Sequence, residues 1–190
     1  MSGLQVQDLA DELVSQLEHW HVQQNRGPLA KLRRGLSAAT RHEACFVLGQ
    51  YFGPAAVGGP LADVYRTVAG CFALYPEGSS RGAGNFGATM RAAMGDRMDV
   101  NEETHSRFRR LLGCGTREEI CRHVPHAVRL AKSKEAKVDY RKLFEDLWFW
   151  GDRVKVAWTQ AYWKTPEPTE MELGEKGELV EEDAEAIGPT

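Results

Sequence analysis

The sequence predicts an all-α fold followed by a disordered acidic C-terminal tail, and three observations support this prediction. Apolar residues recur three and four positions apart over much of residues 1–164, which is the spacing of one face of a helix. Helix start and stop signals bound these stretches. No segment alternates apolar and polar residues through a run of β-branched side chains, so we expect few or no strands.

The first half of the chain divides into helical segments separated by glycine and proline. An apolar stripe from Leu9 to Trp20 predicts an opening helix that ends near Asn25. Pro28 suits a first helical position and Gly35 a C-terminal stop, and together they bound a short, strongly basic helix. Further helices are expected at residues 40–51, 61–75 and 86–94.

The second half predicts three more helices. Asn101 can cap the first of them. Thr116, with Glu119 three residues later, forms a capping box for the next helix, which Pro125 should interrupt or kink. Asp139 begins the last and strongest apolar pattern, which runs to about residue 162.

Charge is distributed unevenly along the chain. The formal net charge is −3, but residues 167–190 hold nine acidic residues and one lysine. Residues 26–166 hold 23 basic against 14 acidic residues. A basic body of this kind suits the phosphate backbone of nucleic acids, with a merely solvated surface as the alternative. The tail has little to bury, so we expect residues 166–190 to be disordered.

Cysteine usage and hydropathy predict a cytoplasmic protein. The four cysteines lie singly among apolar or helical residues, without the dense spacing of a secreted disulfide scaffold. No segment approaches the roughly 18 consecutive apolar residues of a bilayer-spanning helix, and the first ten residues do not resemble a signal peptide. We expect free thiols and no membrane partner.

Two patterns point weakly towards enzymes or metal proteins. Residues 82–87 fit G-x-G-x-x-G, but that motif needs a preceding strand in a βαβ unit, and residues 68–74 look helical. A flexible loop that enters a helix is the better interpretation. His42 with Cys45, and His123 with His126, have the spacing of metal ligands on a helix, but neither pair belongs to a four-ligand set. We expect no catalytic residue, metal or cofactor.

Basic side chains are the better organised candidates. Several surround the second helix without an intervening acid, and others lie one turn apart on later helices. Arginine binds phosphate bidentately, which suits contact with a nucleic-acid backbone. The candidate nucleic-acid-binding residues are Arg26, Lys31, Arg33, Arg34, Arg107, Arg110, Arg122, Arg129, Lys132, Arg153 and Lys155. Those expected to share one continuous surface are Arg107, Arg110, Arg122 and Arg153.

Tryptophans near the end of the helical region have two interpretations. They could stack on the bases of a nucleic acid. Their helical spacing with Leu147 and Val154 favours core packing instead. We therefore expect Trp150 and Trp158 inside the protein.

Several short segments carry a family resemblance that covers most of residues 10–163. The segments are Arg26-Gly27, residues 30–34 (AKLRR), 72–76 (FALYP), 84–87 (GNFG), 107–112 (RFRRLL), 138–140 (VDY), Leu143, Asp146-Leu147, Trp150, Trp158 and Tyr162-Trp163. In this order they resemble the CasB family, the small subunit of the type I-E CRISPR Cascade complex.

The resemblance implies an α-helical protein of two small bundles, which we place at residues 1–97 and 98–165. It also implies a subunit that cleaves nothing and reads no sequence. The implied partners are crRNA and target DNA, the backbone and large subunits of Cascade, and a second copy of the chain. Such a subunit would stabilise the crRNA–target duplex and the displaced strand of the R-loop. R-loop formation is a nearly balanced exchange of duplexes, so modest contacts can favour it.

Two other classes of protein stay open. A helix-turn-helix regulator would read base edges as a symmetric dimer. A helical adaptor would use its basic surface to meet acidic proteins instead of nucleic acid.

Overall fold

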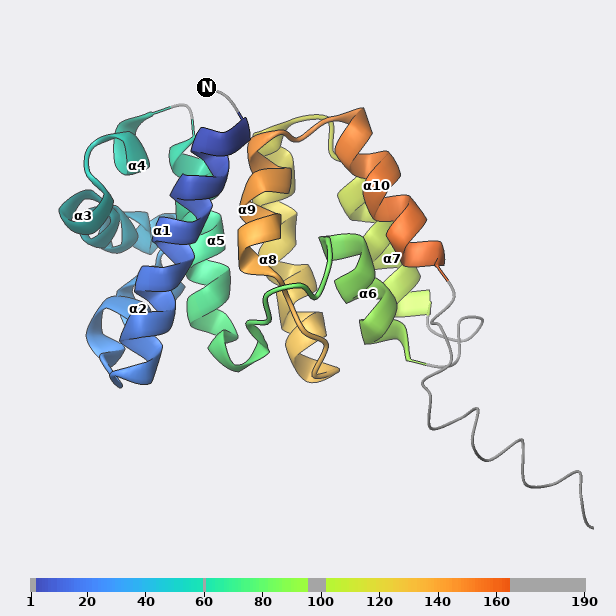
Figure 1. The fold of residues 1–190 in the computed structure, drawn as a ribbon, viewed down its shortest axis with the longest axis horizontal. Helices are drawn as coiled ribbons and strands as arrows, with labels where there is room; N and C mark the ends of the chain where they lie inside the picture. Colours follow the sequence, from blue (N-terminus) through green and yellow to red (C-terminus); the bar gives the residue numbers. More distant parts are fainter. Residues whose placement is uncertain (1–2, 60, 96–101, 165–190) are drawn as a thin grey trace, which may run out of the picture.

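The computed structural model describes residues 3–59, 61–95 and 102–164, which form helices joined by short turns (Figure 1). Within these residues the extended pairing is limited to an isolated bridge between Ser79 and Val138. The prediction of an all-α fold is confirmed. The predicted tail at residues 166–190 lies outside the described residues. The helices are α1 (Gly3–Val22), α2 (Arg26–Arg34), α3 (Arg41–Phe52), α4 (Ala55–Gly58), α5 (Ala62–Leu74), α6 (Phe86–Met94), α7 (Glu102–Leu112), α8 (Arg117–Ser133), α9 (Tyr140–Trp148) and α10 (Asp152–Trp163), with 3-10 turns at η1 (Ala38–Thr40) and η2 (Pro76–Gly78).

Helix α5 lies at the centre of the molecule. Its residues 67–73 are all buried, and it packs against α2 and α8 as well as α1 and α9. In Figure 1, α1 to α5 lie on one side, α6, α7 and α10 on the other, and α8 and α9 between them. Helix α6 packs mainly against α10. The expected boundary between residues 97 and 98 lies outside the described residues, so the division into two bundles stays a prediction.

Side-chain caps define several helix starts that the sequence predicted. The Asn85 side chain accepts a hydrogen bond from the Ala88 N–H at the start of α6. Thr116 and Glu119 form the predicted capping box of α8. Asp139 accepts a hydrogen bond from the Lys142 N–H and caps α9. Each cap supplies a partner for an N–H group that a helix start leaves without one.

Helix α8 runs through Pro125, so of the two predicted effects, an interruption or a kink, the interruption does not occur. Proline has no N–H, so Pro125 cannot donate to the carbonyl of Cys121 one turn earlier. The hydroxyl of Thr67, buried on α5, donates to that carbonyl instead, at 3.4 Å. The Pro125 ring is itself buried. A tertiary hydrogen bond and packing therefore compensate for the residue that should have broken the helix.

The last apolar pattern forms two helices instead of one. Helix α9 ends at Trp148 and α10 begins at Asp152, so Gly151, which fits the apolar stripe in sequence, lies in the turn. The Trp158 indole Nε1 donates to Asp146 Oδ2 at 2.6 Å, and Lys142 Nζ lies 2.9 Å from Asp146 Oδ1. Burial raises the pKa of Asp146, while the bonds from Trp158 and Lys142 lower it. These contacts join α9 and α10 across the turn.

The glycine pattern at residues 82–87 is explained by helix packing and not by a dinucleotide. The segment before it is helix α5 and not a strand. A Cβ atom on Gly87 would lie 2.0 Å from the carbonyl oxygen of Trp158, so only glycine allows α6 to approach α10 this closely.

Candidate nucleic-acid interface

The basic side chains of α7 and α8 gather on one surface. We call this surface the α7–α8 face and define it by Arg107, Arg110, Arg122, His126 and Arg129. The two helices pack against each other, and these side chains are exposed apart from Arg107, which is half-buried. Because α8 is continuous through Pro125, Arg122, His126 and Arg129 align along one side of the helix.

The pKa of His126 shows that the charges of the two helices converge. The neighbouring helix removes some water from the exposed ring and so lowers this pKa, and the positive charges of Arg129 and Arg107, followed by His123 and Arg110, lower it further. A like charge disfavours protonation only from nearby. The α7–α8 face is therefore a concentration of positive charge contributed by two elements.

Acidic partners on this face are few and weakly held. Arg107 pairs with Glu103 at 2.8 Å and Arg122 with Glu118 at 3.2 Å, each one helical turn away. Exposed pairs of this kind contribute roughly 0–1 kcal/mol, so an arriving phosphate can replace the carboxylate. Arg110 has no acidic partner among the residues that the structure describes.

The four candidate residues on α2 differ in whether their charged groups already have a partner. Arg34 donates from both Nε and Nη2 to Glu43 Oε2, so its charge is already compensated. The ammonium group of Lys31 lies 5.6 Å from the centre of the Phe46 ring. Arg33 is exposed, and its guanidinium group has no hydrogen bond or ion pair with any described residue. The Arg26 guanidinium donates to the side chain of Gln24.

The remaining candidates are Lys132, which lies on α8 one turn beyond Arg129, and Arg153 and Lys155, which lie on α10. Lys132 Nζ donates to the Leu74 carbonyl at 3.0 Å, where it stabilises the C-terminal end of α5. Arg153 lines a hollow of about 650 Å³ together with Asn85, Lys142 and Phe149. Lys155 Nζ lies 5.7 Å from the centre of the Trp150 ring. Burial raises the pKa of Cys114, in the turn between α7 and α8, and the charge of Lys155 partly opposes this rise. A surface that Arg153 shares with Arg107, Arg110 and Arg122 stays a prediction.

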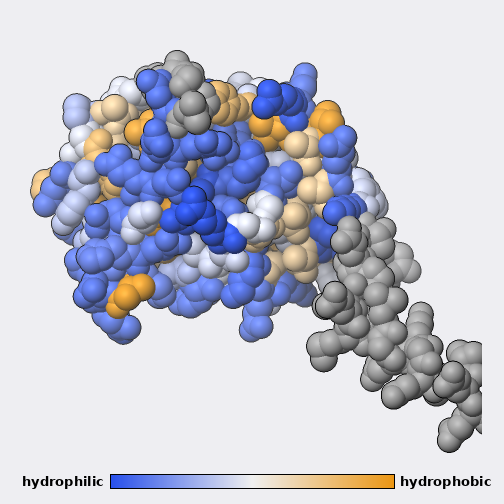
Figure 2. All heavy atoms as spheres, in the orientation of Figure 1, coloured by the Kyte–Doolittle hydropathy of each residue, from blue (hydrophilic) through white to orange (hydrophobic). Residues whose placement is uncertain are grey.

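The tryptophans follow the core-packing prediction with one difference. Trp158 is fully buried, and Trp150 is partly buried with its Nε1 donating to the Cys114 carbonyl. Trp163 is 57% exposed and stacks on His105. Figure 2 shows a mainly hydrophilic face with a smaller hydrophobic area over α6 and α10.

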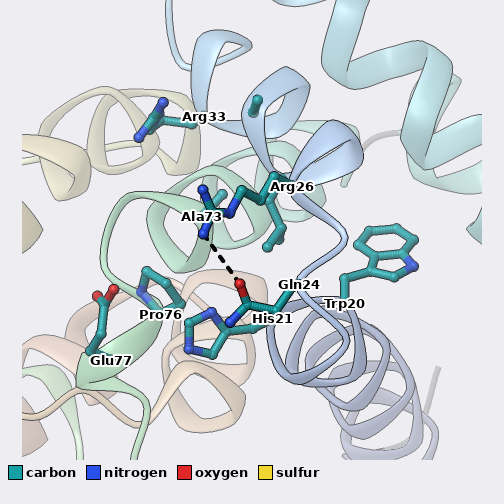
Figure 3. Close-up of a pocket in the computed structure, with 10 residues that line it drawn as sticks. Trp20, His21, Gln24, Arg26, Arg33, Ala73, Pro76 and Glu77 are labelled. Atoms are coloured by element: carbon teal, nitrogen blue, oxygen red, sulfur yellow. Dashed lines mark hydrogen bonds between the residues drawn. The ribbon is translucent and has the colours of Figure 1, made fainter.

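Sequence reasoning missed a pocket bordered by α1, α2 and the turn after α5. Two predicted residues, Arg26 and Arg33, line it together with His21 and Gln24 (Figure 3). No local signal joins these residues to Pro76 and Glu77 on the opposite side, because that contact depends on how α2 packs against α5.

The described residues offer neither a metal site nor a membrane-spanning helix. Within the described ranges, no three His, Cys, Asp or Glu side chains are grouped so that they could hold a metal ion. None of the helices described is both long and apolar enough to cross a bilayer.

Fold and surface together define a small all-helical protein with an arginine-rich face. The chain belongs to the family of CRISPR-associated protein Cse2, whose family model matches residues 28–163. This confirms the resemblance to CasB, which is the same family. No curated protein matches the sequence significantly.

A solved structure has a chain of similar fold. That chain is described as a CRISPR RNA-guided surveillance complex, and it is 23% identical in sequence with a TM-score of 0.66. The match covers 91% of this chain and 99% of that chain.

Proposed function

We propose that this protein is a non-catalytic small subunit of a type I-E CRISPR Cascade complex in the cytoplasm. In this role it binds nucleic acid without sequence specificity and stabilises the crRNA–target duplex and the displaced strand of the R-loop. Membership of the Cse2 family and the fold shared with a chain of a surveillance complex support the proposal. Its partners would be crRNA, target DNA, the backbone and large subunits, and a second copy.

The observation that carries the proposal is the convergence of arginines from α7 and α8 around His126. Guanidinium groups bind phosphate whatever the base sequence, and they release condensed counterions when they do so. Because strand exchange in an R-loop is nearly balanced, a few such contacts on one product can decide whether it persists. This function needs a positively charged surface and no reacting group.

The test is R-loop formation by the assembled complex containing an Arg110→Ala, Arg129→Ala double variant. A charge-assisted hydrogen bond contributes roughly 1.5 kcal/mol or more, so the loss of two should weaken R-loop formation at least about tenfold. The slope of log K against log salt should also shrink by roughly 0.7–0.9 per lost contact. Targets of unrelated sequence should be affected equally.

The matched control is an Arg41→Ala, Lys134→Ala double variant, which removes the same charge from exposed positions outside the α7–α8 face. It should form R-loops like the unaltered complex. Equal affinity and an equal salt slope for both double variants would refute the proposed role of this face.

A further inference from the structure

The pocket between α1, α2 and the turn after α5 has a chemistry different from that of the α7–α8 face. Its volume is about 400 Å³. Pockets that hold small ligands span roughly 300–1,000 Å³, so the size suits a single small group. Figure 3 shows Trp20 on one side of the pocket and Arg33 and Glu77 on the other.

Two guanidinium groups border this pocket. Arg26 Nη2 donates to Gln24 Oε1 at 3.2 Å, which is the dashed line in Figure 3. The backbone of Gln24 has φ 56°, a left-handed conformation that costs free energy for a residue other than glycine. The guanidinium group of Arg33 has no hydrogen bond or ion pair with a described residue. Arg26 thus has one side-chain partner, and Arg33 is free to bind an anion.

The rest of the lining joins an apolar surface to a polar edge. Leu29, Ala30 and Pro76 supply the apolar part, and His21 and Gln24 supply groups that can donate or accept hydrogen bonds. A nucleobase has the same two features, an apolar face and a hydrogen-bonding edge. The phosphate attached to it would need the positive charge that the arginines provide.

Two lysines beside the pocket add positive charge near Glu77, which supplies the one carboxylate of the lining. Lys132 Nζ donates to the Leu74 carbonyl and Lys137 Nζ to the Glu77 carbonyl, at 3.0 and 3.1 Å. Both carbonyls adjoin lining residues. The surroundings of Glu77 therefore do not repel a phosphate.

We propose that this pocket binds one unstacked nucleotide of a single strand, with the base against Leu29, Ala30 and Pro76 and a phosphate at Arg26 and Arg33. The inference rests on the proposed function and makes it more specific. Bases of a duplex are paired and stacked and cannot enter, so the pocket distinguishes a single strand from a double one. The α7–α8 face offers charge alone, so it does not distinguish a single strand from a double one.

The test compares two single-stranded DNA oligonucleotides of equal length and charge, one with bases and one abasic throughout, binding to the full chain. Stacking contributes roughly 1–3 kcal/mol per base, so the strand with bases should bind about fivefold tighter or more. Ala30→Phe fills the pocket and should abolish this preference without changing the salt slope. Arg33→Ala should lower the slope by about 0.7, whereas Arg41→Ala outside the pocket should leave the base preference intact.

Thermal unfolding shows whether Ala30→Phe folds, and Ala30→Leu, which fills the pocket less, replaces it if it does not. Equal binding of the two strands by the unaltered chain would overturn the inference. A preference for the strand with bases that persists in Ala30→Phe would also overturn it. A third refuting result is that a polyglutamate peptide displaces the strand from the unaltered chain but does not bind Ala30→Phe. In each of these cases an R-loop defect in the Arg110, Arg129 variant would still uphold the proposed function.

Discussion

Thr67→Val should destabilise the protein because Thr67, on α5, donates a hydrogen bond to a carbonyl group of α8. The Thr67 hydroxyl is buried and donates to the Cys121 carbonyl, to which Pro125 cannot donate. Valine keeps the branched shape but leaves that carbonyl without this partner. A buried unsatisfied group costs roughly 1–3 kcal/mol, and the length of 3.4 Å indicates the lower end, about 1 kcal/mol. For a chain of this size that lowers Tm by roughly 2–4 °C.

Pro125→Ala supplies the test of this explanation, because alanine restores a backbone N–H that can donate to the Cys121 carbonyl. In that background Thr67→Val should lose most of its cost, which gives a coupling of about 1 kcal/mol in a double-mutant cycle measured by urea unfolding. Thr89→Val is the matched control, since its buried hydroxyl donates to the Lys137 carbonyl and has no relation to Pro125. It should cost the same in both backgrounds. An equal cost of Thr67→Val with and without Pro125 would refute the reasoning.

Three further predictions concern packing, pH and the acidic tail. Gly87→Ala places a Cβ 2.0 Å from the Trp158 carbonyl oxygen, so α6 and α10 must separate. The free energy of unfolding, measured by urea titration, should therefore fall by about 1–3 kcal/mol. Unchanged stability would contradict this packing. DNA phosphates should offset the arginine charges that lower the pKa of His126, so this pKa should rise on binding and affinity should increase as the pH falls from about 8 to about 6. NMR titration checks the pKa, and a pH dependence that persists in His126→Gln would assign it to another group. Deleting residues 167–190 should tighten DNA binding at low salt, with a gain that shrinks as salt rises, because nine acids no longer compete for the basic body. Identical binding at every ionic strength would exclude this masking.

Local signals in the sequence predicted much of the fold. The cap at Asp139 and the capping box at Thr116 depend on residues three positions apart, so the sequence alone contains both partners. The continuity of α8 depends on Thr67, which is 54 residues from the carbonyl it satisfies and has no detectable signal near Pro125. A tertiary hydrogen bond therefore keeps α8 continuous although proline has a low helix propensity.

The same limit applies to the candidate binding residues. Sequence spacing predicts that Arg107 and Arg110 lie one turn apart on α7, because helical phase is a local property, but it does not place α7 beside α8. It could not show that Glu43 neutralises Arg34 or that Lys132 is engaged by the end of α5. Charge is visible in a sequence, but whether a charge is free depends on neighbours that folding brings to it.

The central position of α5 fixes the distance between the pocket and the α7–α8 face. Helix α2, which supplies Arg26 and Arg33 to the pocket, packs against α5. Helix α8, which carries three of the five residues of the α7–α8 face, also packs against α5. Because α5 is buried along most of its length, neither surface can shift without opening the core. A single strand that bound at both places would therefore need at least the number of nucleotides that spans the fixed distance between them.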